Sequence, residues 1–200
     1  CSSCPPADAA LADLADRPDV LALSFHVDYW DYIGWRDPYA SASYTQRQRS
    51  YARYLKERFV YTPQMVVGGA EHLVGSDRGK LRDVLAEERR KQAERGAGIT
   101  LSLSADGSLA VDGPPQPAPR SLWLIGWDDR HETAVERGEN RGRHLTNRNV
   151  VRSLILLGRW QGGAVELPLP VAQLQGDGGA AVLIQAEEVG PVLAALRLNR

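Results

Sequence analysis

The spacing of apolar residues changes near Ala97, and this change limits the folds open to the chain. Up to that point, segments with helical spacing alternate with short apolar runs, as in α/β domains. Beyond it, apolar and polar residues alternate on both sides of Asp106–Gly107, which is typical of a β-hairpin, and further strand candidates follow at sandwich-like spacing. We therefore expect an α/β domain over residues 1–97 and a mostly β, sandwich-like domain over residues 98–200.

The α/β part has recognisable starts and stops. Pro5 and Pro6 fit the first turn of a helix, where backbone N–H groups have no partner within the helix. A short, nearly continuous apolar run favours a strand buried on both faces, usually parallel. The elements expected are, in order, a helix from Cys4, a strand over residues 19–27, a helix over 43–59 capped by Ser43 and Gln46, a hairpin over 65–74 and a helix capped by Asp77.

Composition excludes several classes of partner. The formal net charge of −1 gives no basic excess for nucleic acid. No apolar run approaches the roughly 20 residues that span a bilayer, so we expect a protein that is not transmembrane. The sequence opens on a cysteine, without an initiator Met. We expect that a signal peptide, and a strand ahead of the first helix, are absent from this sequence.

Cys1 and Cys4 are the 2 cysteines of the chain, so if they form a disulfide they form it with each other. Cys1 directly precedes a helix, where free backbone N–H groups and the helix dipole favour a thiolate. It would attack a disulfide, and the less exposed Cys4 would resolve the mixed disulfide. The pattern predicts a redox-active dithiol with these two catalytic residues.

Two other readings of the cysteine pair stay open. Soft thiolates suit Cu(I), and His26 near the end of the apolar run is the best third ligand for a copper chaperone or sensor, ahead of His72. Zinc is disfavoured because a second cysteine pair is absent. The pair could also be a structural disulfide in an interaction module.

The aromatic stretch after the apolar run carries further candidates. Tyr29 and Trp30 could line a groove for a substrate, although packing between the two parts of the chain is favoured for most of these aromatics. Asp28 is the candidate proton acceptor for Cys4. In the stretch RGENRGRH, Arg141 could bind an anion or substrate; equally, Glu139 could bridge arginines at the domain junction.

The order of elements resembles the thioredoxin fold without the strand that precedes its dithiol. Thr62–Pro63 stands where that family places its cis-proline, which implies that both residues face the dithiol and hold an extended substrate. The motifs CSSCPPAD, HVDYWDYIGW, YTPQMVV and RGENRGRHLTNRNVV are similar to the secreted thioredoxin-like family catalogued as domain of unknown function 1223. That resemblance implies a periplasmic or secreted protein of the bacterial envelope.

We therefore expect a thiol–disulfide oxidoreductase that acts on a protein or small-thiol disulfide. Its only cofactor would be its own redox-active disulfide, with copper as the alternative. The direction of electron flow does not follow from the sequence.

Overall fold

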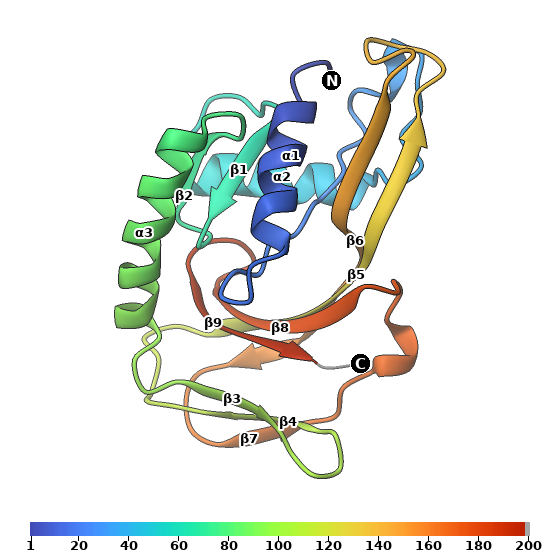
Figure 1. Ribbon diagram of the computed structural model, residues 1–200. Coiled ribbons are helices and arrows are strands. Elements are labelled where there is room, and N and C mark those ends of the chain that lie inside the picture. The colour runs from blue at the N-terminus through green and yellow to red at the C-terminus, as the bar shows by residue number, and fades with distance from the viewer. Residues whose placement is uncertain (199–200) are drawn as a thin grey trace.

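The computed structural model describes residues 1–198 (Figure 1). Residues 1–97, the α/β half, contain α1 (Pro5–Ala15), α2 (Ala42–Tyr54), β1 (Gln64–Val67), β2 (Glu71–Val74) and α3 (Arg78–Arg95). Residues 98–198, the β half, contain β3 (Thr100–Leu103), β4 (Leu109–Asp112), β5 (Arg120–Ala134), β6 (His144–Trp160), β7 (Val165–Leu167), β8 (Gly179–Ala186) and β9 (Val192–Leu198). Short 3-10 turns cover Asp31–Ile33 and Val171–Gln173. Among the described residues, no helix has the length and apolarity needed to cross a membrane.

The helices of the α/β half begin at identifiable caps. Asp77 accepts a hydrogen bond from the Lys80 N–H at 3.0 Å, as expected for the start of α3. The start of α2 differs from the expected capping box. Ser41, in extended conformation, accepts from the Ser43 N–H at 3.2 Å, so Ser43 is a residue of the first turn and not the cap.

The run over residues 19–27 is extended, but the expectation of a regular buried strand is wrong. It forms one isolated parallel bridge, between Ser24 and Val150 of β6. Ser24 donates to the Asn149 carbonyl and accepts from the Val151 N–H, both at 2.9 Å. A strand needs a repeated ladder of such bonds, and here β6 supplies them at a single point. Ala22 is the only buried residue of the run; the others are half-buried or exposed.

The β half consists of two antiparallel sheets. One has the order β6-β5-β8-β9 and the other β3-β4-β7. β5 is one long strand that contains SLWLIGW and runs on through Ala134. β6 is paired with β5 from Arg120 opposite Trp160 to Ala134 opposite His144. In Figure 1 the far end of this long hairpin extends alongside α1 towards the N-terminus.

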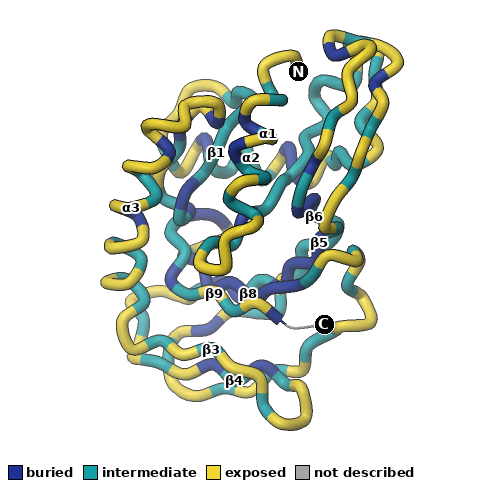
Figure 2. The backbone as a smooth tube through the Cα atoms, viewed as in Figure 1, coloured by how far each residue is buried: buried dark blue, intermediate teal, exposed yellow. Residues whose placement is uncertain are grey.

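The two halves share a core through the four-stranded sheet. Alternate residues of a strand point to opposite faces. Leu122 and Leu124 of β5 therefore pack towards the three-stranded sheet, whereas Ile125 packs with Phe25 and Tyr44 of the α/β half. β8 is buried in the same way on both faces, and Figure 2 shows this buried sheet at the centre of the molecule. The change of pattern near Ala97 therefore marks a change of secondary structure. It does not mark a break in the core, because apolar side chains of both halves pack together.

Candidate dithiol site

The two cysteines lie at the amino end of α1. The Cys4 N–H donates to the Cys1 carbonyl at 3.3 Å, which folds residues 1–4 into a turn. The Cys4 carbonyl then accepts from the N–H groups of Ala7 and Asp8, at 2.9 and 3.0 Å, and so opens the helix. Both thiols are free and half-buried. The chain thus places a dithiol at a helix start, where thiolate is favoured.

Thr62 and Pro63 face this dithiol. The peptide bond between them is cis, and the Cys1 Sγ lies 3.8 Å from the Thr62 carbonyl oxygen. The Thr62 hydroxyl accepts a hydrogen bond from Trp30 Nε1 at 2.9 Å. Cys1, Cys4, Thr62, Pro63 and Trp30 line one continuous cavity. The structure therefore brings together five of the residues singled out from the sequence, and it gives Trp30 a direct contact with Thr62.

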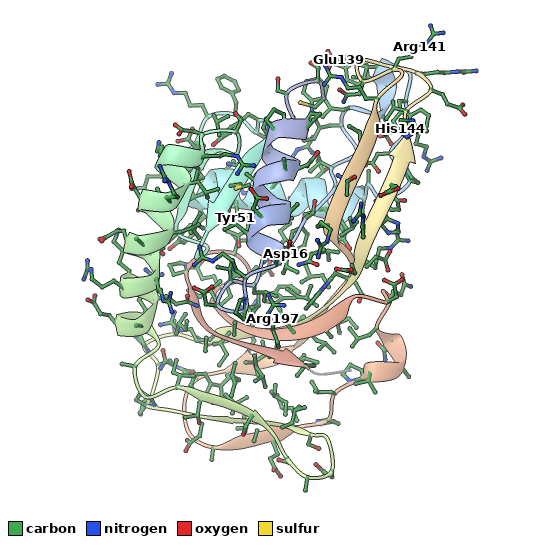
Figure 3. All side chains as sticks on the ribbon, viewed as in Figure 1. Asp16, Tyr51, Glu139, Arg141, His144 and Arg197 are labelled. Atoms are coloured by element: carbon green, nitrogen blue, oxygen red, sulfur yellow. The ribbon has the colours of Figure 1, made fainter. Side chains whose placement is uncertain are left out.

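A loop of the β half holds the Cys1 segment in place. Asn140 Nδ2 donates to the Cys1 carbonyl at 2.9 Å, and the Ser2 N–H donates to Glu139 Oε2 at 2.9 Å. The expectation that Glu139 bridges arginines is wrong, because its carboxylate accepts a hydrogen bond from the Ser2 backbone N–H instead. Figure 3 shows Glu139 and Arg141 on the turn that joins β5 and β6. The Arg141 side chain is exposed and has no hydrogen bond or ion pair within residues 1–198.

Asp8, and not Asp28, is the carboxyl group coupled to Cys4. Asp28 is held by α2, since its Oδ1 accepts from the Thr45 hydroxyl at 2.5 Å and its N–H donates to the same hydroxyl at 3.1 Å. Asp8 follows Cys4 by one helical turn, and residues four apart lie on the same helix face. The carboxyl group that affects the Cys4 pKa therefore lies on α1 itself.

Burial is the main cause of the shifted pKa values of these two groups. Burial, and after it the nearby Asp8 carboxylate, raise the pKa of the Cys4 thiol to about 11. Burial also raises the pKa of Asp8 to about 6, against the opposing effect of His26. At neutral pH Cys4 is accordingly protonated and Asp8 mainly ionised. This is the state in which a carboxylate can accept a thiol proton.

His26 has a partner other than the thiols. Its Nδ1 lies 2.6 Å from Asp37 Oδ2, and its ring packs edge-on against Tyr39 with centroids 5.7 Å apart. Within residues 1–198, no group of three His, Cys, Asp or Glu side chains is arranged to hold a metal ion. The copper ligand set Cys1, Cys4 and His26 is thus not assembled here. His72 lies elsewhere, against Tyr61 and Glu57.

Several buried polar atoms near the dithiol have no hydrogen-bond partner in the described part of the chain. The Tyr29 hydroxyl is one, and burial raises the pKa of this phenol. Gln48 Nε2 donates to Gln64 Oε1 at 2.9 Å, which leaves the other polar atom of each amide unpaired. Asn140 Oδ1 is also unpaired. An unsatisfied buried polar group costs roughly 1–3 kcal/mol.

Comparison with known proteins gives a family. A single family model matches residues 1–185. The chain belongs to the family described as Protein of unknown function (DUF1223). No curated protein matches it. The DUF1223 chain is also similar to the X-ray structure of a structural-genomics target protein from Agrobacterium tumefaciens, at 29% identity and a TM-score of 0.80. That match covers 99% of this chain and 88% of the other.

Sequence reasoning did not assign Asp8 or Asn140 to this DUF1223 site, and it gave Glu139 a different role. Asp8 carried a usable signal, because a carboxylate four residues after the second cysteine shares its helix face. Asn140 and Glu139 carried none. They reach the dithiol only because the long β5–β6 hairpin returns to the N-terminus, 137 residues away for the Ser2–Glu139 contact.

Proposed function

We propose that this protein is a thioredoxin-like thiol–disulfide oxidoreductase of the bacterial envelope or the extracellular space, in which Cys1 attacks and Cys4 resolves. The observation that carries the proposal is the assembly of the dithiol with the Thr62 carbonyl beside Cys1 and the Asp8 carboxyl beside Cys4. A structural disulfide would need neither a half-exposed leading thiol nor a coupled carboxylate. The resemblance of the element order to thioredoxin supports the same chemistry.

The reaction proceeds in two exchanges. The Cys1 thiolate attacks one sulfur of the substrate disulfide, which breaks; a Cys1–substrate disulfide forms and the other substrate sulfur leaves as a thiolate. The Cys4 sulfur then attacks Cys1 Sγ, and the second substrate thiolate leaves. The substrate has gained two electrons and the protein holds a Cys1–Cys4 disulfide. In the reverse direction the same steps oxidise a substrate dithiol.

The second exchange needs a base. With a pKa of about 11, the Cys4 thiol is almost wholly protonated at neutral pH and attacks slowly. The Asp8 carboxylate, with a pKa of about 6, is ionised and can accept that proton as Cys4 attacks. Asp8 thus acts on Cys4 and has no role in the first exchange.

A polypeptide disulfide is the substrate class that the surroundings support best. The buried amides of Gln48, Gln64 and Asn140 carry both donor and acceptor atoms without partners in the described residues, of the kinds that a peptide backbone requires. Thr62 and Trp30 line the same cavity as these amides. No cofactor beyond the protein's own disulfide is needed.

The test is trapping of the mixed disulfide. Cys4→Ser should accumulate a mixed disulfide between Cys1 and a model substrate that carries disulfides, such as insulin. Cys1→Ser should form none. Wild-type protein should reduce insulin with dithiothreitol as the electron source. Equal insulin reduction by wild type and Cys1→Ser would overturn the proposal. So would a Cys1–Cys4 potential well below about −300 mV, which marks inert structural disulfides. Stoichiometric Cu(I) uptake that His26→Ala abolishes would favour the copper alternative.

A further inference from the structure

A second pocket lies away from the two cysteines, where α2 meets the four-stranded sheet. Its volume is about 560 Å³, which is within the roughly 300–1,000 Å³ of small-molecule sites. Its walls are residues 38–41, the first part of α2, Trp123 of β5, residues 151–154 of β6, and Glu188 and Val189 of the loop between β8 and β9. Neither cysteine lines this pocket, so its chemistry is separate from that of the dithiol.

Arg152 of β6 brings into the pocket a cation that makes no hydrogen bond within residues 1–198. Its guanidinium lies over the Tyr39 ring, 5.5 Å from the centroid, and its Nε is 3.6 Å from Asp128 Oδ2. That oxygen lies closer to His131 Nε2, at 2.7 Å. The Arg152 side chain is only 32% exposed. Donors buried to this degree are normally satisfied, so the free end of this fixed guanidinium is unusual.

Two more unpaired donors line the same pocket. Trp123 Nε1 is buried and has no hydrogen-bond partner in the described residues. Tyr44 is 8% exposed, and its hydroxyl also makes no hydrogen bond within residues 1–198. Burial raises the pKa of the Tyr44 phenol, and the positive charge of Arg152 acts in the opposite direction, which indicates that the hydroxyl lies near this guanidinium. The phenol is therefore protonated at neutral pH and can donate.

The charged side chains around the pocket favour an anion. Arg47 is held in place, because its guanidinium donates to the Glu188 carbonyl at 3.1 Å and to Gln185 Oε1 at 2.8 Å. The Glu188 carboxylate is turned to Arg159, with 3.5 Å between Oε1 and Nη2. Two guanidiniums therefore face the pocket, and the one carboxylate among its described lining residues is paired elsewhere. A negatively charged acceptor would satisfy the unpaired donors.

The remaining walls suit the carbon body of a ligand. Val151 and Val189 are buried, Leu154 is half-buried, and all three line the pocket together with the Tyr39 ring. An inorganic anion would leave these apolar walls uncovered, whereas an organic acid would cover them. A planar carboxylate also matches the fork of N–H donors that a guanidinium presents.

We propose that this pocket binds a small organic carboxylic acid, with Arg152 as the main partner of its carboxylate, Tyr44 and Trp123 as further donors, and Val151 and Leu154 in contact with its carbon body. The bound acid would connect α2 to β6, the edge strand of the four-stranded sheet. This inference does not depend on the redox chemistry, and it goes beyond it.

The experiment titrates the isotope-labelled 200-residue protein with each of three acids, phenylacetate, isovalerate and succinate. It follows the NMR signal of the Trp123 indole N–H, which Trp123→Phe assigns. At least one acid should shift that signal to saturation, with a Kd below about 1 mM. Arg152→Gln should weaken this binding by about tenfold or more, and Tyr44→Phe by about threefold, because each removes a donor and keeps most of the side-chain volume. Arg49→Gln, at an exposed position of α2 outside the pocket, is the matched control and should bind like wild type.

Several results would overturn the proposal. The absence of a saturable shift with all three acids is one, and unchanged affinity in both Arg152→Gln and Tyr44→Phe is another. Phenylethanol is the neutral analogue of phenylacetate, and equal binding of the two would show that the charge is not recognised. Inorganic phosphate bound as tightly as the best acid would show that the apolar walls contribute nothing. If Arg152→Gln does not fold, Tyr44→Phe decides, and unchanged affinity in that variant alone overturns the proposal.

Discussion

Asp8 lies one helical turn beyond Cys4 on α1, and its N–H donates to the Cys4 carbonyl at 3.0 Å. The same turn of helix therefore carries the buried thiol with a pKa of about 11 and the carboxyl group with a pKa of about 6. Few backbone degrees of freedom separate the two groups, so their coupling is a property of α1 and not of a mobile loop.

The first prediction concerns the rate of resolution. Asp8→Asn removes the proton acceptor of Cys4 and should slow release of the mixed disulfide by about a hundredfold at pH 7, a typical contribution of general-base catalysis. The first attack by Cys1, measured as single-turnover adduct formation, should be little affected. The difference between wild type and variant should shrink as the pH falls below about 6, where Asp8 itself is protonated.

Asp28→Asn is the matched control, because Asp28 is bound to Thr45 and not coupled to Cys4. Stopped-flow measurement of both variants decides between the two carboxylates. Slow resolution in Asp28→Asn together with normal resolution in Asp8→Asn would contradict the assignment.

The second prediction concerns stability. Burial raises the pKa of Asp8 from 3.8 to about 6, so the ionised carboxylate is penalised in the folded protein. The stability linked to its protonation is fully present below the unfolded pKa and is lost as the pH rises through about 6. Asp8→Asn should therefore raise the free energy of unfolding by roughly 1–2 kcal/mol at pH 8, less than the full shift because the side chain is partly exposed.

At pH 4 that gain should largely vanish, because folded Asp8 is then protonated and resembles Asn. Urea denaturation of wild type and Asp8→Asn at pH 4 and pH 8 measures both values. A gain that is the same at the two pH values would mean that packing, and not charge burial, is responsible.

The third prediction concerns the loop of the β half that holds Cys1. Asn140 is 8% exposed and donates to the Cys1 carbonyl. Asn140→Ala should lower the free energy of unfolding by about 1–2 kcal/mol and accelerate alkylation of Cys1 by iodoacetamide, since the turn is released. Arg141→Ala, at an exposed neighbouring position whose side chain has no hydrogen bond or ion pair within residues 1–198, should stay within about 0.5 kcal/mol of wild type. The idea fails if the Arg141 variant has the larger effect on alkylation.

The fourth prediction concerns the junction of the two halves. Gln185 of β8 is fully buried; its Nε2 donates to the Tyr51 hydroxyl at 2.6 Å and its Oε1 accepts from Arg47 at 2.8 Å. Gln185→Ala would leave partners on α2 unpaired, and we expect a loss of about 2–4 kcal/mol. Thermal unfolding should remain a single transition that moves to lower temperature.

The control for Gln185→Ala is Leu156→Ala on β6, at a side chain that is 44% exposed. It should shift the transition far less. Two separate transitions, with only that of the β half displaced by Gln185→Ala, would show that the halves unfold independently.

Local signals in the sequence were sufficient for several elements. The cap at Asp77, the hairpin of β1 and β2 and the helix start after Cys4 depend on residues within a few positions of one another. The length of β5 was not predictable, because its outer end has little apolar alternation and is extended only through its pairing with β6. Residues 19–27 failed for the opposite reason: their apolar pattern is that of a strand, but within the described residues they form one isolated bridge, to Val150 of β6.

By itself, the sequence determined that a dithiol stands at the start of a helix and that α/β elements give way to β-strands, because both features depend on short-range preferences of the backbone. Only the tertiary structure decided which carboxyl group is coupled to Cys4, that Asn140 and Glu139 hold the Cys1 turn, and that the halves share a core. Those contacts join residues far apart in the chain, and side-chain burial and long-range pairing, which set them, are not encoded in any local pattern.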